Sequence, residues 1–182
     1  MYTPKCVVSK YNDLDFNQLY DSGYRIIISD LDNTLAPYTN DSPSEELIEQ
    51  INNIKTIGFK IYLISNNKKE RIEHFCKLLG IDGYLSNAKK PNPKRLARFL
   101  DDNNLDKELI IALGDQLVTD ILGFNRLGLY SVLVKTIDKK TQKWYTKINR
   151  LREKKILKEI TKYDYLIGET IKRVISQGDK NE

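Results

Sequence analysis

The sequence is poor in the residues that most often carry catalysis or covalent cross-links. It has two cysteines, Cys6 and Cys76, and a single histidine, His74, among 182 residues. Two cysteines without metal-ligand spacing exclude a disulfide framework and indicate a reducing compartment. His74 lies in a helical pattern and is expected at the surface. Acid–base chemistry must therefore come from carboxylates, lysine or tyrosine.

Long apolar runs are also absent. No stretch approaches the roughly 18 apolar residues of a membrane-spanning helix, and the first residues have no apolar core of a signal peptide. We expect a cytoplasmic protein, with peripheral contact with a membrane left open. The length suits one domain, with a core over residues 24–136, an N-terminal lead-in over 1–23 and a C-terminal basic helical extension over 139–182.

The net charge of +5 is unevenly distributed. Ten basic residues lie from Lys139 to Lys162 against two acidic ones, so the remainder has 30 − 10 = 20 basic and 25 − 2 = 23 acidic residues. Apolar residues from Trp144 to Ile160 drift around the predicted helix. Four interpretations stay open: a surface helix with solvated lysines, a helix packed on the sheet, a contact with an anionic membrane, or a contact with nucleic acid.

Short β-branched runs alternate with amphipathic helical patterns. The runs are typical of strands buried on both faces, so the sequence predicts an α/β fold with a doubly wound, mostly parallel sheet. Strands are expected at 25–29, 60–64, 83–85, 109–113 and 130–134. Helices are expected at 15–22, from Ser42 as N-cap to 57, and near 72–79, 93–100 and 117–127. The last twenty residues predict a short strand at Tyr165–Ile167 and a final helix.

Polar and charged residues follow four of these strands. Asp30 and Asp32 follow the first, Ser65 the second, the Lys89–Lys90 loop the third, and Asp115 the fourth. Parallel strands bring their carboxyl ends to one edge, where ligands of such sheets bind. Asp30 and Asp32 share a strand face and repel each other unless a cation such as Mg²⁺ lies between them. An Asp-rich turn that merely caps a strand is the alternative.

In order and spacing these segments resemble the four motifs of the haloacid dehalogenase superfamily. The resemblance is closest to the subfamily IIIA phosphatases of the YqeG type and covers about residues 10–165. The segments that carry it are Asp30-Leu31-Asp32-Asn33-Thr34, Ser65-Asn66, Lys90 and Gly114-Asp115-Gln116-Leu117-Val118-Thr119-Asp120. It implies a Rossmann-like fold and a magnesium-dependent phosphate-monoester hydrolase.

The resemblance also implies a role for each residue. Asp30 would be the nucleophile that forms an aspartyl-phosphate, and Asp32 the general acid and then base. Thr34 would steady the nucleophile, Ser65 and Asn66 would bind the phosphoryl oxygens, and Lys90 would neutralise the aspartyl-phosphate. Mg²⁺ would rest on the Asp30 carboxylate, the Asp32 carbonyl and Asp115, with Asp120 as helper.

Some assignments have alternatives. Lys89 competes with Lys90 for the lysine role, and Lys90 is favoured because it precedes the proline. Asp120 could instead orient Lys90 or its own loop. Asn125 and Arg126 belong to the family pattern but are expected to be structural.

The spacing between motifs bears on the substrate. The 31 residues from Thr34 to Ser65 and the 25 from Ser65 to Lys90 are filled by a loop, a helix and a strand, so no cap domain fits. An open site suits a phosphate on a large molecule or a lipid, and the resemblance raises phosphatidylglycerophosphate. The alternatives are a phosphatase for a nucleotide, a nucleic-acid end or a phosphoprotein, and a non-catalytic protein that binds RNA or ribosomes.

Overall fold

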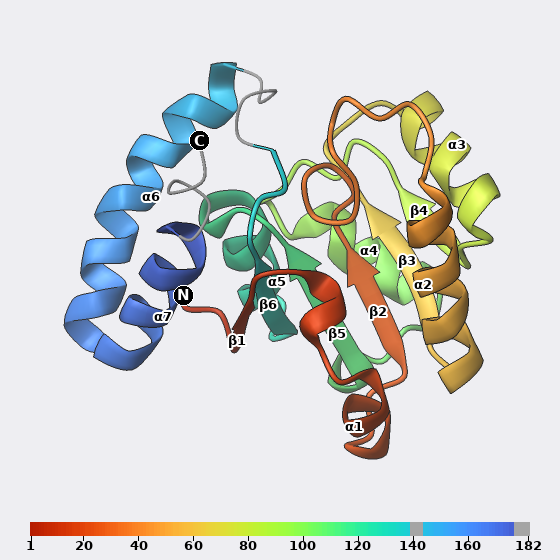
Figure 1. Cartoon of the computed structure of the whole chain (residues 1–182), viewed down its shortest axis with the longest axis horizontal. Coiled ribbons are helices and arrows are strands. Elements are labelled where there is room, and N and C mark those ends of the chain that lie inside the picture. The colour runs from red at the N-terminus through yellow and green to blue at the C-terminus, as the bar shows by residue number, and fades with distance from the viewer. Residues whose placement is uncertain (139–143, 177–182) are drawn as a thin grey trace.

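A parallel sheet flanked by helices forms the centre of the protein (Figure 1). The computed structural model describes the backbone of residues 1–138 and 144–176 and the side chains of residues 1–138 and 152–175. Within these ranges one six-stranded sheet has the order β1-β6-β5-β2-β3-β4, and every pairing is parallel. The strands are β1 (Cys6–Val8), β2 (Ile26–Ser29), β3 (Lys60–Ile64), β4 (Gly83–Leu85), β5 (Ile110–Gly114) and β6 (Tyr130–Val134). The predicted doubly wound α/β fold is confirmed.

Helices lie between the strands and after the last of them. They are α1 (Phe16–Asp21), α2 (Glu45–Ile57), α3 (Lys69–Leu79), α4 (Lys94–Asp102), α5 (Leu122–Asn125), α6 (Trp144–Tyr163) and α7 (Tyr165–Ser176). Short 3₁₀ turns lie at η1 (Tyr11–Asp13) and η2 (Lys107–Leu109), and a π-helical turn, η3 (Leu117–Ile121), leads into α5. Only α2 lies between β2 and β3, and only α3 between β3 and β4, so neither connection carries a cap domain.

Side-chain alternation divides the core into two layers. On one face Ile27, Leu63 and Leu113 pack with the apolar sides of α2 and α3. On the other face Ile28 and Ile64 pack with α4 and α5. The successive strand residues point to opposite faces and both faces are covered, which accounts for the unbroken apolar runs. This packing fixes where each strand ends, and therefore where the polar residues that follow it lie.

The C-terminal helices α6 and α7 pack beside the sheet. A third apolar cluster joins Ile160 of α6 and Ile171 of α7 to Leu117, Ile121 and Leu133. Part of the basic segment, residues 144–163, is helical, and Ile156, Leu157 and Ile160 of this helix lie in the third apolar cluster, as the packed-helix alternative requires. Residues 139–143 and 177–182 of the predicted extension lie outside the described ranges. No helix of the described chain is long and apolar enough to cross a membrane.

Three local predictions were wrong. No strand was expected in the N-terminal lead-in over 1–23, but Cys6–Val8 pairs with β6 as an edge strand. The segment Tyr165–Ile167 was expected to be a strand but begins α7, because the Asp164 carboxylate accepts a hydrogen bond from the Ile167 amide (3.1 Å) and caps a helix. The N-cap of α2 is Ser44 rather than Ser42, since the Ser44 hydroxyl accepts from the Leu47 amide (3.2 Å).

Candidate active site

The site begins where β2 ends. The strand residues 26–29 are all buried, and the Asp30 amide still donates to the Leu113 carbonyl of β5 (2.9 Å). The chain then turns back, with the amides of Leu35 and Ala36 both donating to the Leu31 carbonyl. This tight turn presents Asp30 and Asp32 beside the end of β5. The strands that follow β2 in the sequence are added first on one side of it (β3, β4) and then on the other (β5, β6). The Asp30–Asp32 pair therefore lies at the switch point of the sheet.

Asp30 is the buried member of the pair. Its Oδ1 atom lies 2.6 Å from Nζ of Lys90, and the Thr34 hydroxyl donates to its Oδ2 atom (3.4 Å). Burial raises the pKa of Asp30 to about 7 against the lowering effect of Lys90, and the charges of Asp120 and Asp32 raise it further. An added cation beside Asp30 would favour the ionised carboxylate and lower this pKa.

Lys90 connects two carboxylates. Its ammonium group contacts Asp30 and Asp120, each at 2.6 Å, and donates to the Ile64 carbonyl (3.1 Å). Burial would lower the pKa of Lys90, but the charges of Asp120 and Asp30 raise it above its ordinary value. Lys90 is therefore a permanent cation beside Asp30. Lys89, in contrast, is exposed, so the geometry favours Lys90 for the lysine role.

Both carboxylate oxygens of Asp120 have partners within the protein. Its Oδ1 atom pairs with Lys90, and its Oδ2 atom accepts from the Gln116 amide (3.0 Å). This is the arrangement expected if Asp120 orients Lys90 and its own loop. A Cβ atom on Gly114 would lie 2.7 Å from Cγ of Asp120, so glycine is required there for Asp120 to lie against β5.

Asp115 has a different environment. The Thr136 hydroxyl donates to its Oδ2 atom (2.8 Å), whereas its Oδ1 atom is buried and has no hydrogen-bond partner in the described structure. Burial raises the pKa of Asp115 well above its ordinary value, and the charges of Asp120 and Asp30 add to the effect. A buried carboxylate oxygen without a partner costs free energy unless a ligand satisfies it.

The oxygen donors fit a magnesium ion. Mg²⁺ is commonly held by one or two carboxylates together with waters and substrate phosphate, and here Asp30 and Asp115 follow the adjacent strands β2 and β5. Among the described side chains no group of three or more His, Cys, Asp or Glu is arranged to hold a metal ion. The expected ligands are only two side chains, Asp30 and Asp115, and the backbone carbonyl of Asp32, so they do not make a group of three side chains. The unsatisfied Asp115 oxygen is the observation that favours a cation.

Asp32 is held by residues that the sequence did not single out. Nε of Arg71, on α3, lies 2.8 Å from its Oδ1 atom, and Nδ2 of Asn67 donates to its Oδ2 atom. The same guanidinium donates to the carbonyls of Asn40 (2.7 Å) and Pro37 (3.4 Å). Arg71 therefore joins the expected acid–base carboxylate to the loop after β2.

Ser65 and Asn66 follow β3 at the same edge. Ser65 is buried, and its hydroxyl accepts from the Asn67 amide (3.0 Å). The Asn66 side chain accepts from the Lys90 amide (2.8 Å) and donates to the Lys90 carbonyl (3.2 Å), so it holds the backbone of the lysine.

The structure thus brings all eight predicted site residues to one edge of the sheet. Asn125 and Arg126 donate hydrogen bonds to backbone carbonyls, of Thr3 (2.9 Å) and Pro91 (2.9 Å) respectively, so their contacts are structural.

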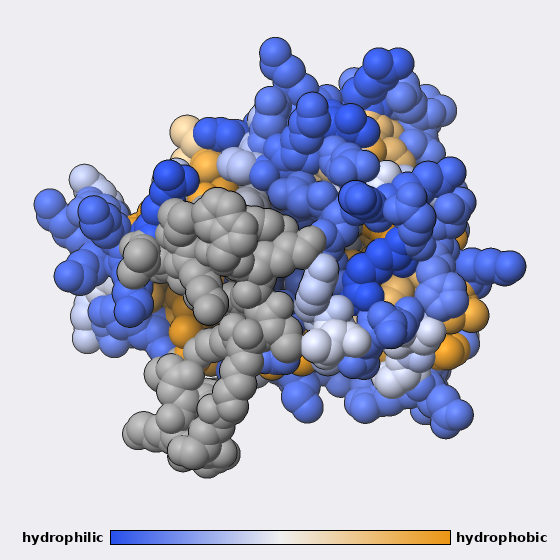
Figure 2. Space-filling view, turned by 90° about the horizontal axis from the view of Figure 1, so that it is seen from above, coloured by the Kyte–Doolittle hydropathy of each residue, from blue (hydrophilic) through white to orange (hydrophobic). Residues whose placement is uncertain are grey.

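Figure 2 views the molecule from this edge, where hydrophilic side chains cover most of the half that contains β3, β4 and α3.

Comparisons with known proteins point to one family. The sequence profile of a family described as mitochondrial PGP phosphatase matches residues 1–137. The probable phosphatase YqeG of Bacillus subtilis is 34% identical over 149 residues, which cover 82% of this chain and 86% of that protein. A copper-transporting ATPase of Helicobacter pylori is 26% identical over 113 residues, which cover 59% of this chain but 15% of that protein.

Solved structures agree on the fold. The D,D-heptose 1,7-bisphosphate phosphatase of B. bronchiseptica, complexed with magnesium and phosphate, has a TM-score of 0.52 at 16% identity and covers 62% of this chain and 81% of that chain. The cobalt-bound deoxy-D-mannose-octulosonate 8-phosphate phosphatase of Haemophilus influenzae has a TM-score of 0.50 at 12% identity, over 62% of this chain and 68% of that chain.

Proposed function

Because the chain belongs to the PGP phosphatase family of haloacid dehalogenase-type phosphatases, we propose that it hydrolyses a phosphate monoester through a phosphorylated Asp30. The observation that carries this mechanism is the buried contact of Asp30 with Lys90 at 2.6 Å, next to a second carboxylate, Asp115, with an unsatisfied oxygen.

In the first step the Asp30 carboxylate attacks phosphorus. A new bond forms between Asp30 and phosphorus, and the bond from phosphorus to the leaving oxygen breaks. Asp32 donates its proton to that oxygen. Lys90 stabilises the acyl phosphate because its charge lies beside the attacking carboxylate, and Ser65 with the Asn66 amide would bind the phosphoryl oxygens.

In the second step water releases the phosphate. Asp32, now ionised, removes a proton from the water, whose oxygen attacks phosphorus and frees the Asp30 carboxylate. Arg71 and Asn67 contact the two oxygens of Asp32, which fixes the orientation of the carboxylate. In the proposed mechanism the same carboxylate serves as acid in the first step and as base in the second.

The residues that would hold Mg²⁺ are Asp30, Asp115 and the Asp32 carbonyl, while Asp120 acts through Lys90. When bound, Mg²⁺ would neutralise charge that develops on the phosphoryl oxygens. The heptose bisphosphate phosphatase that shares the fold was solved with magnesium and phosphate, which supports magnesium as the cofactor here.

The experiment is hydrolysis of an aryl phosphate by the purified protein, with Mg²⁺ or with EDTA. The parent protein should turn over only with metal, and Asp30→Asn should lower turnover at least about a thousandfold. Asp101→Asn, an exposed carboxylate on α4, is the matched control. Turnover of Asp30→Asn within a few fold of this control would contradict the mechanism.

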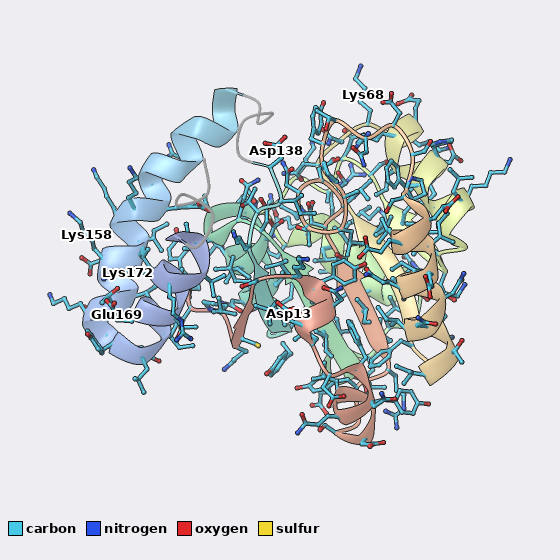
Figure 3. The ribbon with its side chains drawn as sticks, viewed as in Figure 1. Asp13, Lys68, Asp138, Lys158, Glu169 and Lys172 are labelled. Atoms are coloured by element: carbon cyan, nitrogen blue, oxygen red, sulfur yellow. The ribbon has the colours of Figure 1, made fainter. Side chains whose placement is uncertain are left out.

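For the substrate we propose a phosphorylated lipid, phosphatidylglycerophosphate, at a cytoplasmic membrane surface. The support is the family description and a basic stripe on α6, formed by four exposed lysines of the described chain: Lys154, Lys155, Lys158 and Lys162. Figure 3 shows Lys158 pointing away from the body of the molecule. Each lysine near an anionic bilayer contributes about 1 kcal/mol of attraction, which salt screens.

Reversal of the four stripe lysines to Glu should abolish sedimentation with anionic liposomes and leave aryl phosphate hydrolysis unchanged. A control reverses four exposed lysines elsewhere: Lys60, Lys77, Lys94 and Lys107. Unchanged sedimentation of the stripe variant would refute the membrane contact. If the parent protein does not bind liposomes but is retained on RNA, and the stripe variant is no longer retained, the nucleic-acid alternative is favoured.

A screen of phospholipid, nucleotide and phosphopeptide substrates tests the substrate itself.

A further inference from the structure

The C-terminal helix α6 makes a polar contact with the metal-site loop. Oε1 of Glu153 accepts a hydrogen bond from the Leu117 amide (2.7 Å), 36 residues earlier in the chain. Leu117 is the first residue of η3, and the first amides of a helical segment lack partners within it. The N-cap residue, Gln116, provides no side-chain cap. Glu153 therefore supplies the acceptor that the loop itself does not.

The capped turn carries the acidic residues of the site. Asp115 lies two residues before Leu117, and Asp120 lies three residues after it. The Gln116 amide is taken by Asp120, whose other oxygen pairs with Lys90 (2.6 Å). A carboxylate of α6 and a carboxylate of the site thus cap the same turn from two sides.

The fit between this turn and β5 leaves little room for adjustment. Asp120 lies so close to Gly114 that a methyl group on the glycine would overlap it. A shift of η3 would therefore move Asp120 against the strand and pull on Lys90. Interiors are close-packed and transmit such shifts rather than absorb them.

Apolar packing fixes the position of α6 on the turn. Leu117 and Ile121 of η3 lie in one cluster with Ile160 of α6 and Ile171 of α7. The helix pair is thus anchored by apolar contacts and reaches the site through Glu153.

We propose that Glu153 is a positioning residue of the phosphatase site, and that the pair α6–α7 is a working part of that site. The inference rests on the proposed function for its catalytic consequence, but the contact itself does not. Residues 144–176 lie beyond the residues 1–137 that the family profile matches.

The test compares Glu153→Ala and Glu153→Gln with Glu159→Ala, which removes an exposed carboxylate of the same helix. Hydrogen exchange of the peptide that contains residues 115–121 is measured in metal-free protein. Glu153→Ala should speed exchange of the Leu117 amide roughly ten- to hundredfold, because a hydrogen bond to a charged acceptor is lost. Glu153→Gln should restore part of the protection, since its carbonyl oxygen can still accept.

In the activity assay, Glu153→Ala should raise the Mg²⁺ concentration for half-maximal turnover roughly tenfold, and Glu153→Gln less. The proposal would be overturned if Glu153→Ala showed the same exchange rate at residues 115–121 and the same Mg²⁺ dependence of turnover as Glu159→Ala. Faster exchange spread evenly over the whole protein would also overturn it, because Glu153 would then support only general stability. A parent protein without phosphatase activity would refute the proposed function, while the exchange measurement would still decide the positioning role.

Discussion

Replacement of Asp115 by asparagine should stabilise the metal-free protein while it destroys the enzyme. Asp115 is buried, and its Oδ1 atom has no partner among the described residues. Asparagine keeps an oxygen that can accept from Thr136 and removes the buried charge. It also places an amide donor near Asp30 and Asp120, whose charges oppose ionisation of Asp115.

The magnitude follows from the cost of an unsatisfied buried group, about 1–3 kcal/mol. For a protein of this size 1 kcal/mol shifts the melting temperature by about 2–4 °C, so the gain should be about 2–12 °C. The folded-state pKa of Asp115 is raised, so the native protein binds this proton more tightly than the unfolded chain. The native state therefore loses stability as pH rises through the interval between the two pKa values, and the gain from Asp115→Asn should be larger at pH 8 than at pH 5.

The assay is thermal unfolding at both pH values, with EDTA or with Mg²⁺, alongside Asp101→Asn as the control. Mg²⁺ should raise the melting temperature of the parent and of the control but not of Asp115→Asn. A variant that melts below the parent in EDTA at pH 8 would show that Asp115 is satisfied within the protein. The assignment of Asp115 as a metal ligand would then lose its main structural support.

Three further substitutions test other parts of the site. Asp32→Asn should slow turnover by about a hundredfold or more while magnesium-induced stabilisation persists, because only its backbone carbonyl is assigned to the metal; equal loss of the metal response would refute that division. Arg71→Ala should lower turnover of alkyl phosphates more than that of aryl phosphates, since good leaving groups need less help from Asp32; an equal loss on both would reduce Arg71 to a structural role. Gly114→Ala should displace Asp120 and abolish activity even where the protein still folds, as measured by turnover and circular dichroism, and full activity would refute the close packing.

The main strands and the position of the site could be predicted because they depend on local pattern. Each buried strand is a run of apolar residues, and parallel strands must place their carboxyl ends together, so Asp30, Ser65 and Asp115 meet without further information. β1 could not be predicted, since three residues among polar neighbours become a strand only through pairing with β6. The start of α7 depends on one cap at Asp164, which competes with the strand preference of the residues that follow.

The supporting residues of the site left no signal in the sequence. Arg71 acts on Asp32 across 39 residues, Thr136 on Asp115 across 21, and Glu153 on Leu117 across 36. None of them lies in a motif with a spacing of its own. Each contact exists only because packing brings two separate segments together. The residues expected to react could thus be named from the sequence, whereas the residues that hold them required the structure.

Capture of the phosphorylated protein tests the central claim most directly. Asp32→Asn should slow release of phosphate, so an acid quench during turnover of a labelled aryl phosphate with Mg²⁺ should leave phosphate on the protein. Borohydride reduces an acyl phosphate on Asp to homoserine, whereas phosphate on a hydroxyl survives. We predict homoserine at position 30 and an unlabelled protein when Asp30 is also replaced by Asn. Label that resists borohydride, or that persists without Asp30, would contradict the account.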